Sequence, residues 1–140
     1  MISAALRSHK SIHWATPKTL YDELNAEFAF DYDPCPLHSE TEGVLPLFAS
    51  WIGKRVFCNP PYGPEIADWL NHWRETELAV FLLPARTDTK WFHEIVLPDA
   101  TEVRFLKGRL CFNDGGGSAP FPSMIVVFNG TVNAASPLIG

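Results

Sequence analysis

The chain has 140 residues, of which 46% are hydrophobic and 19% are charged. This composition excludes an intrinsically disordered chain, and the length predicts one domain over residues 1–140. A formal net charge of −5 argues against tight, non-specific binding to nucleic acid but permits a weaker encounter. The cysteines at 35, 58 and 111 lack CxxC spacing, so neither a zinc site nor any other metal is expected. Since no apolar run approaches 18 residues, we expect a cytoplasmic protein that does not enter a membrane.

The first predicted elements are a flexible arm over residues 1–13 and a helix that follows it. Thr16 is a typical N-cap, and Pro17 suits the first helical position. Apolar and polar residues alternate over 28–33, which predicts a strand. That strand ends in the stiff turn Asp33-Pro34-Cys35-Pro36.

Strands alternate with helices along the rest of the chain. The strands are predicted over residues 55–58, 79–83, 102–106 and 124–128, with a short antiparallel piece over 110–112. The helices are predicted after Pro64 and over 88–97, and residues 130–140 are predicted to form a frayed tail. This alternation indicates an α/β fold with a mostly parallel sheet and an antiparallel hairpin at its C-terminal end.

The run Asn59-Pro60-Pro61-Tyr62 directly follows a predicted strand, at the edge where open α/β sheets bind their ligands. An amino group on an aromatic base is a poor nucleophile, because its lone pair is delocalised into the ring. Two acceptors, the Asn59 side chain and the Pro60 carbonyl, would favour a tetrahedral nitrogen. Pro61 stiffens the loop, and Tyr62 offers a flat face to an extruded base. The alternative is a proline-rich turn with a core tyrosine.

Several further segments accompany this run. They are Trp14-Ala15-Thr16-Pro17, Phe30-Asp31-Tyr32-Asp33-Pro34, Asn59-Pro60-Pro61-Tyr62-Gly63, Leu83-Pro84-Ala85-Arg86-Thr87-Asp88-Thr89, Trp91-Phe92-His93, Phe105-Leu106-Lys107-Gly108-Arg109-Leu110 and Pro120-Phe121-Pro122-Ser123. Together the segments resemble the phage-type Dam family of DNA adenine N6-methyltransferases. The resemblance implies a Rossmann-like S-adenosylmethionine-dependent methyltransferase sandwich, reduced in size. It also implies methyl transfer from S-adenosylmethionine to the N6 amino group of adenine in DNA, by a phage or prophage enzyme in the cytoplasm of a bacterial host.

The resemblance further implies which residues form the cofactor pocket. They are Trp14, Thr16, Pro17, Asp31, Asp33, Pro34, Cys35 and Asn59. The helix N-terminus at Pro17 suits the methionine carboxylate. Asp33 suits the amino group or a ribose hydroxyl, and the alternative is a turn aspartate bonded to its own backbone. The Gly-rich loop of larger methyltransferases is absent, so no carboxylate is assigned to the ribose, although Glu40 and Glu42 are available.

Basic and polar residues after two later strands are the expected substrate contacts. They are Arg86, Thr87, Lys107 and Arg109. Arg86 would hold a phosphate or orient the base, while Thr87 or Asp88 caps the next helix. The turn that contains Lys107 and Arg109 either touches the DNA backbone or is a solvated surface turn. The expected partner is duplex DNA with a flipped adenine, and a homodimer would supply further basic surface.

Two other functions fit the same residues. A glutamine amide presents a planar NH2 group like that of adenine, so the acceptor could be RNA adenine or protein glutamine. A catalytically silent binding module with the same fold is the third hypothesis, and the intact Asn59 and Tyr62 argue against it.

Overall fold

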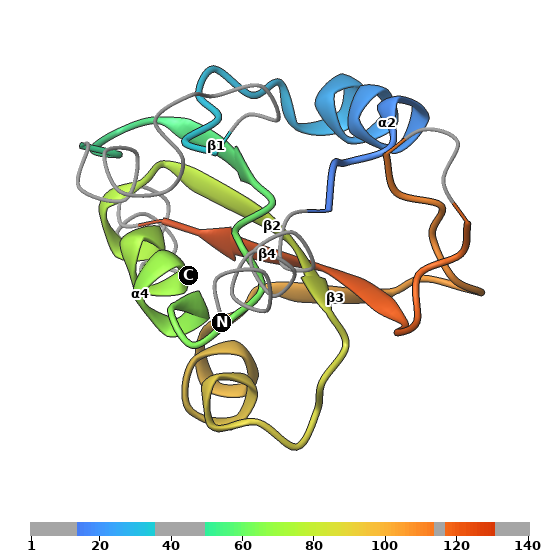
Figure 1. Ribbon diagram of the computed structural model, residues 1–140. Helices are drawn as coiled ribbons and strands as arrows, with labels where there is room; N and C mark the ends of the chain where they lie inside the picture. The colour runs from blue at the N-terminus through green and yellow to red at the C-terminus, as the bar shows by residue number, and fades with distance from the viewer. Residues whose placement is uncertain (1–13, 36–49, 114–116, 131–140) are drawn as a thin grey trace, which may run out of the picture.

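The computed structural model describes residues 14–35, 50–113 and 117–130. At its centre is a four-stranded sheet with the strand order β1-β2-β4-β3 (Figure 1). The strands are β1 (Arg55–Cys58), β2 (Leu78–Pro84), β3 (Glu102–Phe105) and β4 (Ser123–Asn129). The predicted arm over 1–13, nearly all of the predicted tail, Glu40 and Glu42 lie outside the described residues.

The sheet is mixed, and one strand runs against the other three. β1 pairs with β2 in parallel, whereas β4 pairs antiparallel with both β2 and β3. The α/β class and the reversed strand near the C-terminus are therefore as predicted. The structure adds that this reversed strand is inserted between β2 and β3.

Helices cover both faces of the sheet (Figure 1). On one face α2 (Lys18–Phe28) places Tyr21 edge-on against Phe57 of β1. On the other face lie α4 (Ile66–Asn71), the 3-10 helix η1 (His72–Glu75), the π-helix η2 (Phe92–Val96) and α5 (Leu97–Asp99). There Trp73 stacks on Phe128 of β4 with ring centroids 5.1 Å apart. All of β2 is buried, which is why its sequence is a continuous apolar run. In the part of the chain that the structure describes, no helix is long and apolar enough to cross a membrane.

The strand predicted over residues 28–33 is wrong. α2 continues to Phe28, and Ala29 then turns the chain with a left-handed φ of 54°. Only Tyr32 forms an isolated parallel bridge, to Val56 of β1. The alternation of apolar residues at this point reflects the end of a helix packed on β1, because Phe30 also lies against Phe57.

Two smaller expectations also differ from the structure. Residues 110–112 form no strand, and the Leu110 carbonyl accepts one hydrogen bond, from the Ala119 N–H at 2.9 Å. The helical segment after β2 is capped by neither Thr87 nor Asp88. Instead the Thr89 hydroxyl accepts the Phe92 N–H at 3.2 Å.

Candidate active site

Three connections meet at the edge of the sheet where β1 and β2 end. Asn59 follows β1 and Arg86 follows β2, and the two strands are parallel. β4 begins at the same edge, since Ser123 pairs with Pro84, and this places Phe121 nearby. The motif run and the segment after β2 are therefore brought together as the sequence predicted.

Asn59 is held by the segment that precedes α2. Its Nδ2 donates to the Trp14 carbonyl and to the Thr16 hydroxyl, the latter at 3.0 Å. A carbonyl oxygen can only accept, so the amide nitrogen must face Trp14 and the amide oxygen must face away. That oxygen, Oδ1, is buried and has no hydrogen-bond partner among the described residues.

Thr16 does not cap α2, contrary to the prediction. The helix begins at Lys18 with Pro17 at the N-cap position, and no side chain caps it. The Thr16 hydroxyl is instead an acceptor for Asn59. No side-chain hydrogen bond caps the first turn of α2, where helical N–H groups lack partners within the helix.

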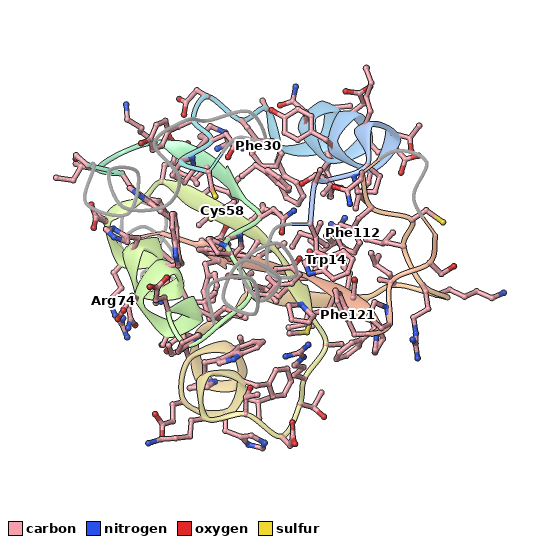
Figure 2. All side chains as sticks on the ribbon, in the orientation of Figure 1. Trp14, Phe30, Cys58, Arg74, Phe112 and Phe121 are labelled. Atoms are coloured by element: carbon pink, nitrogen blue, oxygen red, sulfur yellow. The ribbon has the colours of Figure 1, made fainter. Side chains whose placement is uncertain are left out.

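Aromatic rings pack beside Asn59. Trp14 lies 5.5 Å from Phe112 and 5.3 Å from Phe121 between ring centroids, and Figure 2 shows the three side chains gathered together. Tyr62 is edge-on to Phe121 at 5.7 Å and donates its hydroxyl to the Leu82 carbonyl at 3.1 Å. Burial raises the pKa of Tyr62 well above its ordinary value. Only 5% of Tyr62 is exposed, so the ring presents no open face here, and base stacking stays a prediction.

Asp33 lies in the turn after the bridge to β1. Its Oδ1 accepts the Cys35 N–H at 2.9 Å, which is the backbone bond of a turn aspartate. Burial raises the pKa of Asp33 to about 6, although the bond from Cys35 lowers it in part. Within the described ranges no basic side chain forms an ion pair with this carboxylate. Pro34 is buried and Cys35 is half-buried beside it.

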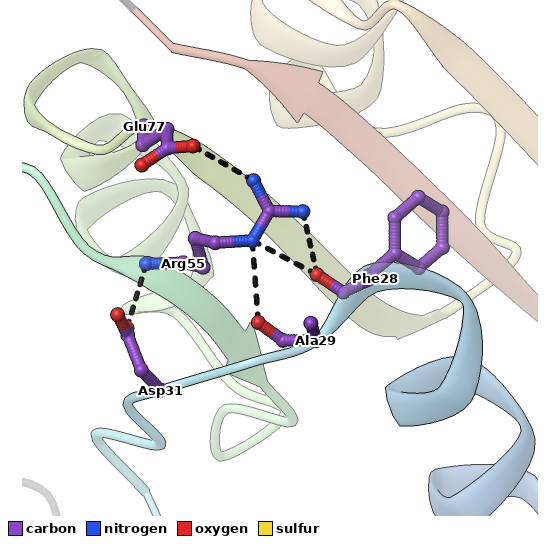
Figure 3. A network of polar contacts seen from close by, with 5 residues as sticks. All are labelled: Phe28, Ala29, Asp31, Arg55 and Glu77. Atoms are coloured by element: carbon purple, nitrogen blue, oxygen red, sulfur yellow. Dashed lines mark hydrogen bonds and ion pairs between the residues drawn. The ribbon is translucent and has the colours of Figure 1, made fainter.

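Asp31 lies at the opposite end of β1 and is not brought to Asn59. Its Oδ1 accepts the Arg55 N–H at 2.8 Å. The Arg55 guanidinium in turn donates to Glu77 at 2.9 Å and to the carbonyls of Phe28 and Ala29 at the end of α2 (Figure 3). In this structure Asp31 belongs to a network that fixes α2 to β1.

The residues that we expect to contact the substrate are exposed to solvent. Arg86 is exposed, and its guanidinium lies over the Phe121 ring at 5.6 Å. The exposed Thr87 accepts a hydrogen bond at its carbonyl from Nε2 of His93 at 2.7 Å. Lys107 and Arg109 are exposed after β3, which ends at the same edge because Phe105 pairs with Met124.

Sequence reasoning assigned no role to Phe112, Asn113 or Phe121. Asn113 has a left-handed φ of 62° and is hydrogen-bonded to Ala15. An asparagine before a run of glycines indicates a turn, but no spacing in the sequence relates it to Ala15. Among the described residues no group of three or more His, Cys, Asp or Glu side chains could hold a metal ion.

Comparison with known proteins gives one match. A family model described as DNA N-6-adenine-methyltransferase (Dam) matches residues 3–134. Searches of curated proteins and of solved structures gave no match. The matched range contains every residue that meets at the edge around Asn59.

Proposed function

The chain belongs to the DNA N-6-adenine-methyltransferase (Dam) family. We propose that it takes the methyl group from S-adenosylmethionine, and that Asn59 binds the adenine amino group that receives it. Membership of this family makes the chain an enzyme that methylates the N6 amino group of adenine in DNA. The observation that carries the proposed site is the buried Oδ1 of Asn59, which has no partner among the described residues. Neither the comparisons nor the described residues favour RNA adenine or protein glutamine as the acceptor.

Asn59 binds and orients the amino group to be methylated. Its Oδ1 accepts a hydrogen from the N6 nitrogen, and the Pro60 carbonyl accepts the second hydrogen. Both bonds would draw the nitrogen lone pair out of conjugation and make N6 nucleophilic. As N6 gained the methyl group supplied by S-adenosylmethionine, S-adenosylhomocysteine would leave and N6 would release one proton. Pro61 keeps the loop rigid. The fixed donors and acceptors cost no reorganisation during the reaction.

The residues next to Asn59 fit S-adenosylmethionine. The cofactor carries an ammonium and a sulfonium, and when bound it supplies an electrophilic methyl group. Asp33 offers a carboxylate that no described cation neutralises, and its raised pKa is what burial without a cation produces. The uncapped first turn of α2 after Pro17 suits the methionine carboxylate. Trp14, Thr16, Pro34 and Cys35 complete the proposed pocket.

The arrangement of the strands supports a reduced Rossmann-like methyltransferase sandwich. Three strands point the same way, and helices lie on both faces. The bridge between Tyr32 and Val56 continues the parallel part of the sheet beyond β1. That continuation brings the turn at Asp33 next to the carboxyl end of β1, where such folds bind ligands.

The proposed DNA surface follows the same edge. Arg86, Thr87, Lys107 and Arg109 are all exposed there, and they would contact the backbone of a duplex from which one adenine is flipped. Since the net charge of the chain is −5, a homodimer would add basic surface to a weak contact.

Transfer of a labelled methyl group tests the proposal. Purified protein is incubated with labelled S-adenosylmethionine and either duplex DNA, RNA or a protein mixture, and the DNA is then hydrolysed to nucleosides. We expect label only in the DNA, as N6-methyl-2′-deoxyadenosine. The matched control is a duplex whose adenines already carry the N6 methyl group, which should accept no label. Label in RNA or protein and none in DNA would overturn the assignment of the acceptor.

A further inference from the structure

Asn113 is joined to Ala15 by two hydrogen bonds. Its backbone N–H donates to the Ala15 carbonyl at 3.0 Å, and its side-chain Oδ1 accepts the Ala15 N–H at 2.9 Å. The two residues are 98 positions apart in the chain. One asparagine therefore holds the peptide groups on both sides of Ala15.

One of these peptide groups also orients Asn59. The Ala15 N–H and the Trp14 carbonyl belong to the same planar peptide unit, in which they point in opposite directions. Asn113 holds the N–H side of that unit, and Asn59 Nδ2 donates to its carbonyl side. Fixing the N–H therefore also fixes the carbonyl that orients the Asn59 amide.

The orientation matters because the two ends of an amide have nearly the same shape and opposite hydrogen-bonding character. If the Asn59 amide turned by half a rotation, its NH2 group would face the amino group of the substrate, donor against donor. The Trp14 carbonyl, which can only accept, prevents this rotation, and the Thr16 hydroxyl accepts from the same Nδ2. Both belong to the segment that Asn113 holds.

The backbone of Asn113 is suited to this task. Its φ of 62° is in the left-handed region, which asparagine and glycine adopt more readily than other residues. In this conformation its N–H and its side chain both reach Ala15. The preceding Phe112 packs on the Trp14 ring, with the ring centroids 5.5 Å apart. The neighbouring residues Phe112 and Asn113 therefore contact the neighbouring residues Trp14 and Ala15.

We propose that Asn113 is a positioning residue for methyl transfer, which acts by holding the Trp14–Ala15 peptide so that Oδ1 of Asn59 faces the acceptor amino group. The proposal rests on the proposed function of Asn59. Asn113 itself touches neither the amino group nor the methyl group.

The test compares two substitutions at residue 113. Asn113→Gly removes Oδ1 but keeps the left-handed backbone without strain, and Asn113→Asp keeps an acceptor oxygen. At saturating S-adenosylmethionine and DNA we expect kcat to fall about tenfold for Asn113→Gly and by less than about twofold for Asn113→Asp. The KM for DNA should change less than kcat. Ser118→Ala, at an exposed position of the same connection, is the matched control and should leave kcat unchanged.

A double substitution separates positioning from a general loss of structure. Asn59→Asp has no amide hydrogen to donate to the Trp14 carbonyl, so Asn113→Gly should cost no further activity in that background. Equal losses in both backgrounds, or a wild-type kcat for Asn113→Gly while Asn59→Ala is slow, would overturn the role of Asn113. If Asn59→Ala is as fast as the wild-type enzyme, the proposed function has failed instead. All rates are measured at a temperature where circular dichroism shows every variant folded.

Discussion

The two ends of β1 carry polar side chains in contrasting surroundings. At the amino end Arg55 uses its backbone and its guanidinium together, and it binds Asp31, Glu77 and two carbonyls at the end of α2. At the carboxyl end Asn59 bonds only through its nitrogen, and its buried oxygen has no partner among the described residues. These ends lie only a four-residue strand apart.

The contrast separates a structural cluster from a candidate reactive one. A buried polar group without a partner costs free energy, so proteins keep few of them and tend to keep them where a ligand supplies the partner. The carboxyl end also holds Asp33, whose pKa is raised by burial and only partly lowered by the hydrogen bond from Cys35. Substitutions at the amino end should therefore lower stability, and substitutions at the carboxyl end should lower activity.

The largest effect is expected at Asn59. Asn59→Ala should lower the single-turnover rate by about 10²–10³-fold, because one preorganised acceptor is lost, while the midpoint of urea unfolding changes little. Asn59→Asp keeps an acceptor oxygen and should retain part of the activity. S-adenosylmethionine binding, measured by calorimetry, should persist in both variants. If the Asn59→Ala enzyme had the wild-type rate, the carboxyl end of β1 would not be the reactive end, and the contrast with the amino end would be wrong.

The next effect is the dependence of stability on pH at Asp33. Burial raises the pKa of Asp33 from 3.8 to about 6 in the folded protein, so the folded state holds the proton more tightly than the unfolded state. Ionisation of Asp33 should therefore lower the free energy of unfolding as pH rises from about 4 to 6, by at most about 3 kcal/mol.

Asp33→Asn is the comparison for this prediction. The difference in unfolding free energy between variant and wild type, from urea titrations across pH 4–8, should grow in favour of the variant up to about pH 6 and then stay level. Saturating S-adenosylmethionine should shrink the difference, because a bound cation favours the ionised carboxylate. A constant difference across this pH range would contradict the prediction.

At the amino end, Arg55→Lys should lower the free energy of unfolding by about 2 kcal/mol. Lysine keeps the charge but cannot bind Glu77 and the helix carbonyls at the same time. Arg74→Lys is the matched control, since Arg74 is exposed and its ion pair with Asp99 is 3.4 Å long, and it should cost less than about 0.5 kcal/mol. The kcat of the folded Arg55→Lys protein should equal that of wild type, and a loss of kcat would tie this end to catalysis.

The smallest effect concerns the exposed charges beyond β3. Replacing Lys107 and Arg109 together with glutamine should make the plot of log DNA affinity against log salt concentration less steep, by at most the contribution of about two phosphate contacts. The kcat at saturating DNA should hardly change. Lys54→Gln, next to the amino end of β1, is the control and should leave the slope unaltered. A double variant with an unchanged slope would assign Lys107 and Arg109 to ordinary solvated surface.

Local sequence predicted the four strands of the sheet closely, but it also predicted strands over 28–33 and 110–112 that do not form. β1 has the predicted bounds, and β2 and β4 extend their predicted ranges by one residue at each end, because apolar runs between turn-forming residues leave few alternatives. The strand predicted over residues 28–33 was wrong, since a helix end packed on a strand shows the same alternation of apolar and polar residues as a strand. Thr16 was misassigned as a cap because its hydroxyl bonds to Asn59, a residue 43 positions away.

The sequence by itself determined the α/β class, the place of Asn59 at the end of a strand and the family, because those depend on local pattern and on contiguous motifs. Only the tertiary structure decided which way the Asn59 amide faces, that Tyr62 is buried, and that Asp31 lies at the far end of β1 while Asp33 lies near Asn59. It also decided the contact between Asn113 and Ala15, which are 98 positions apart. The physical reason is that hydrogen bonds between distant segments depend on how the strands and helices pack, and no local spacing encodes that packing.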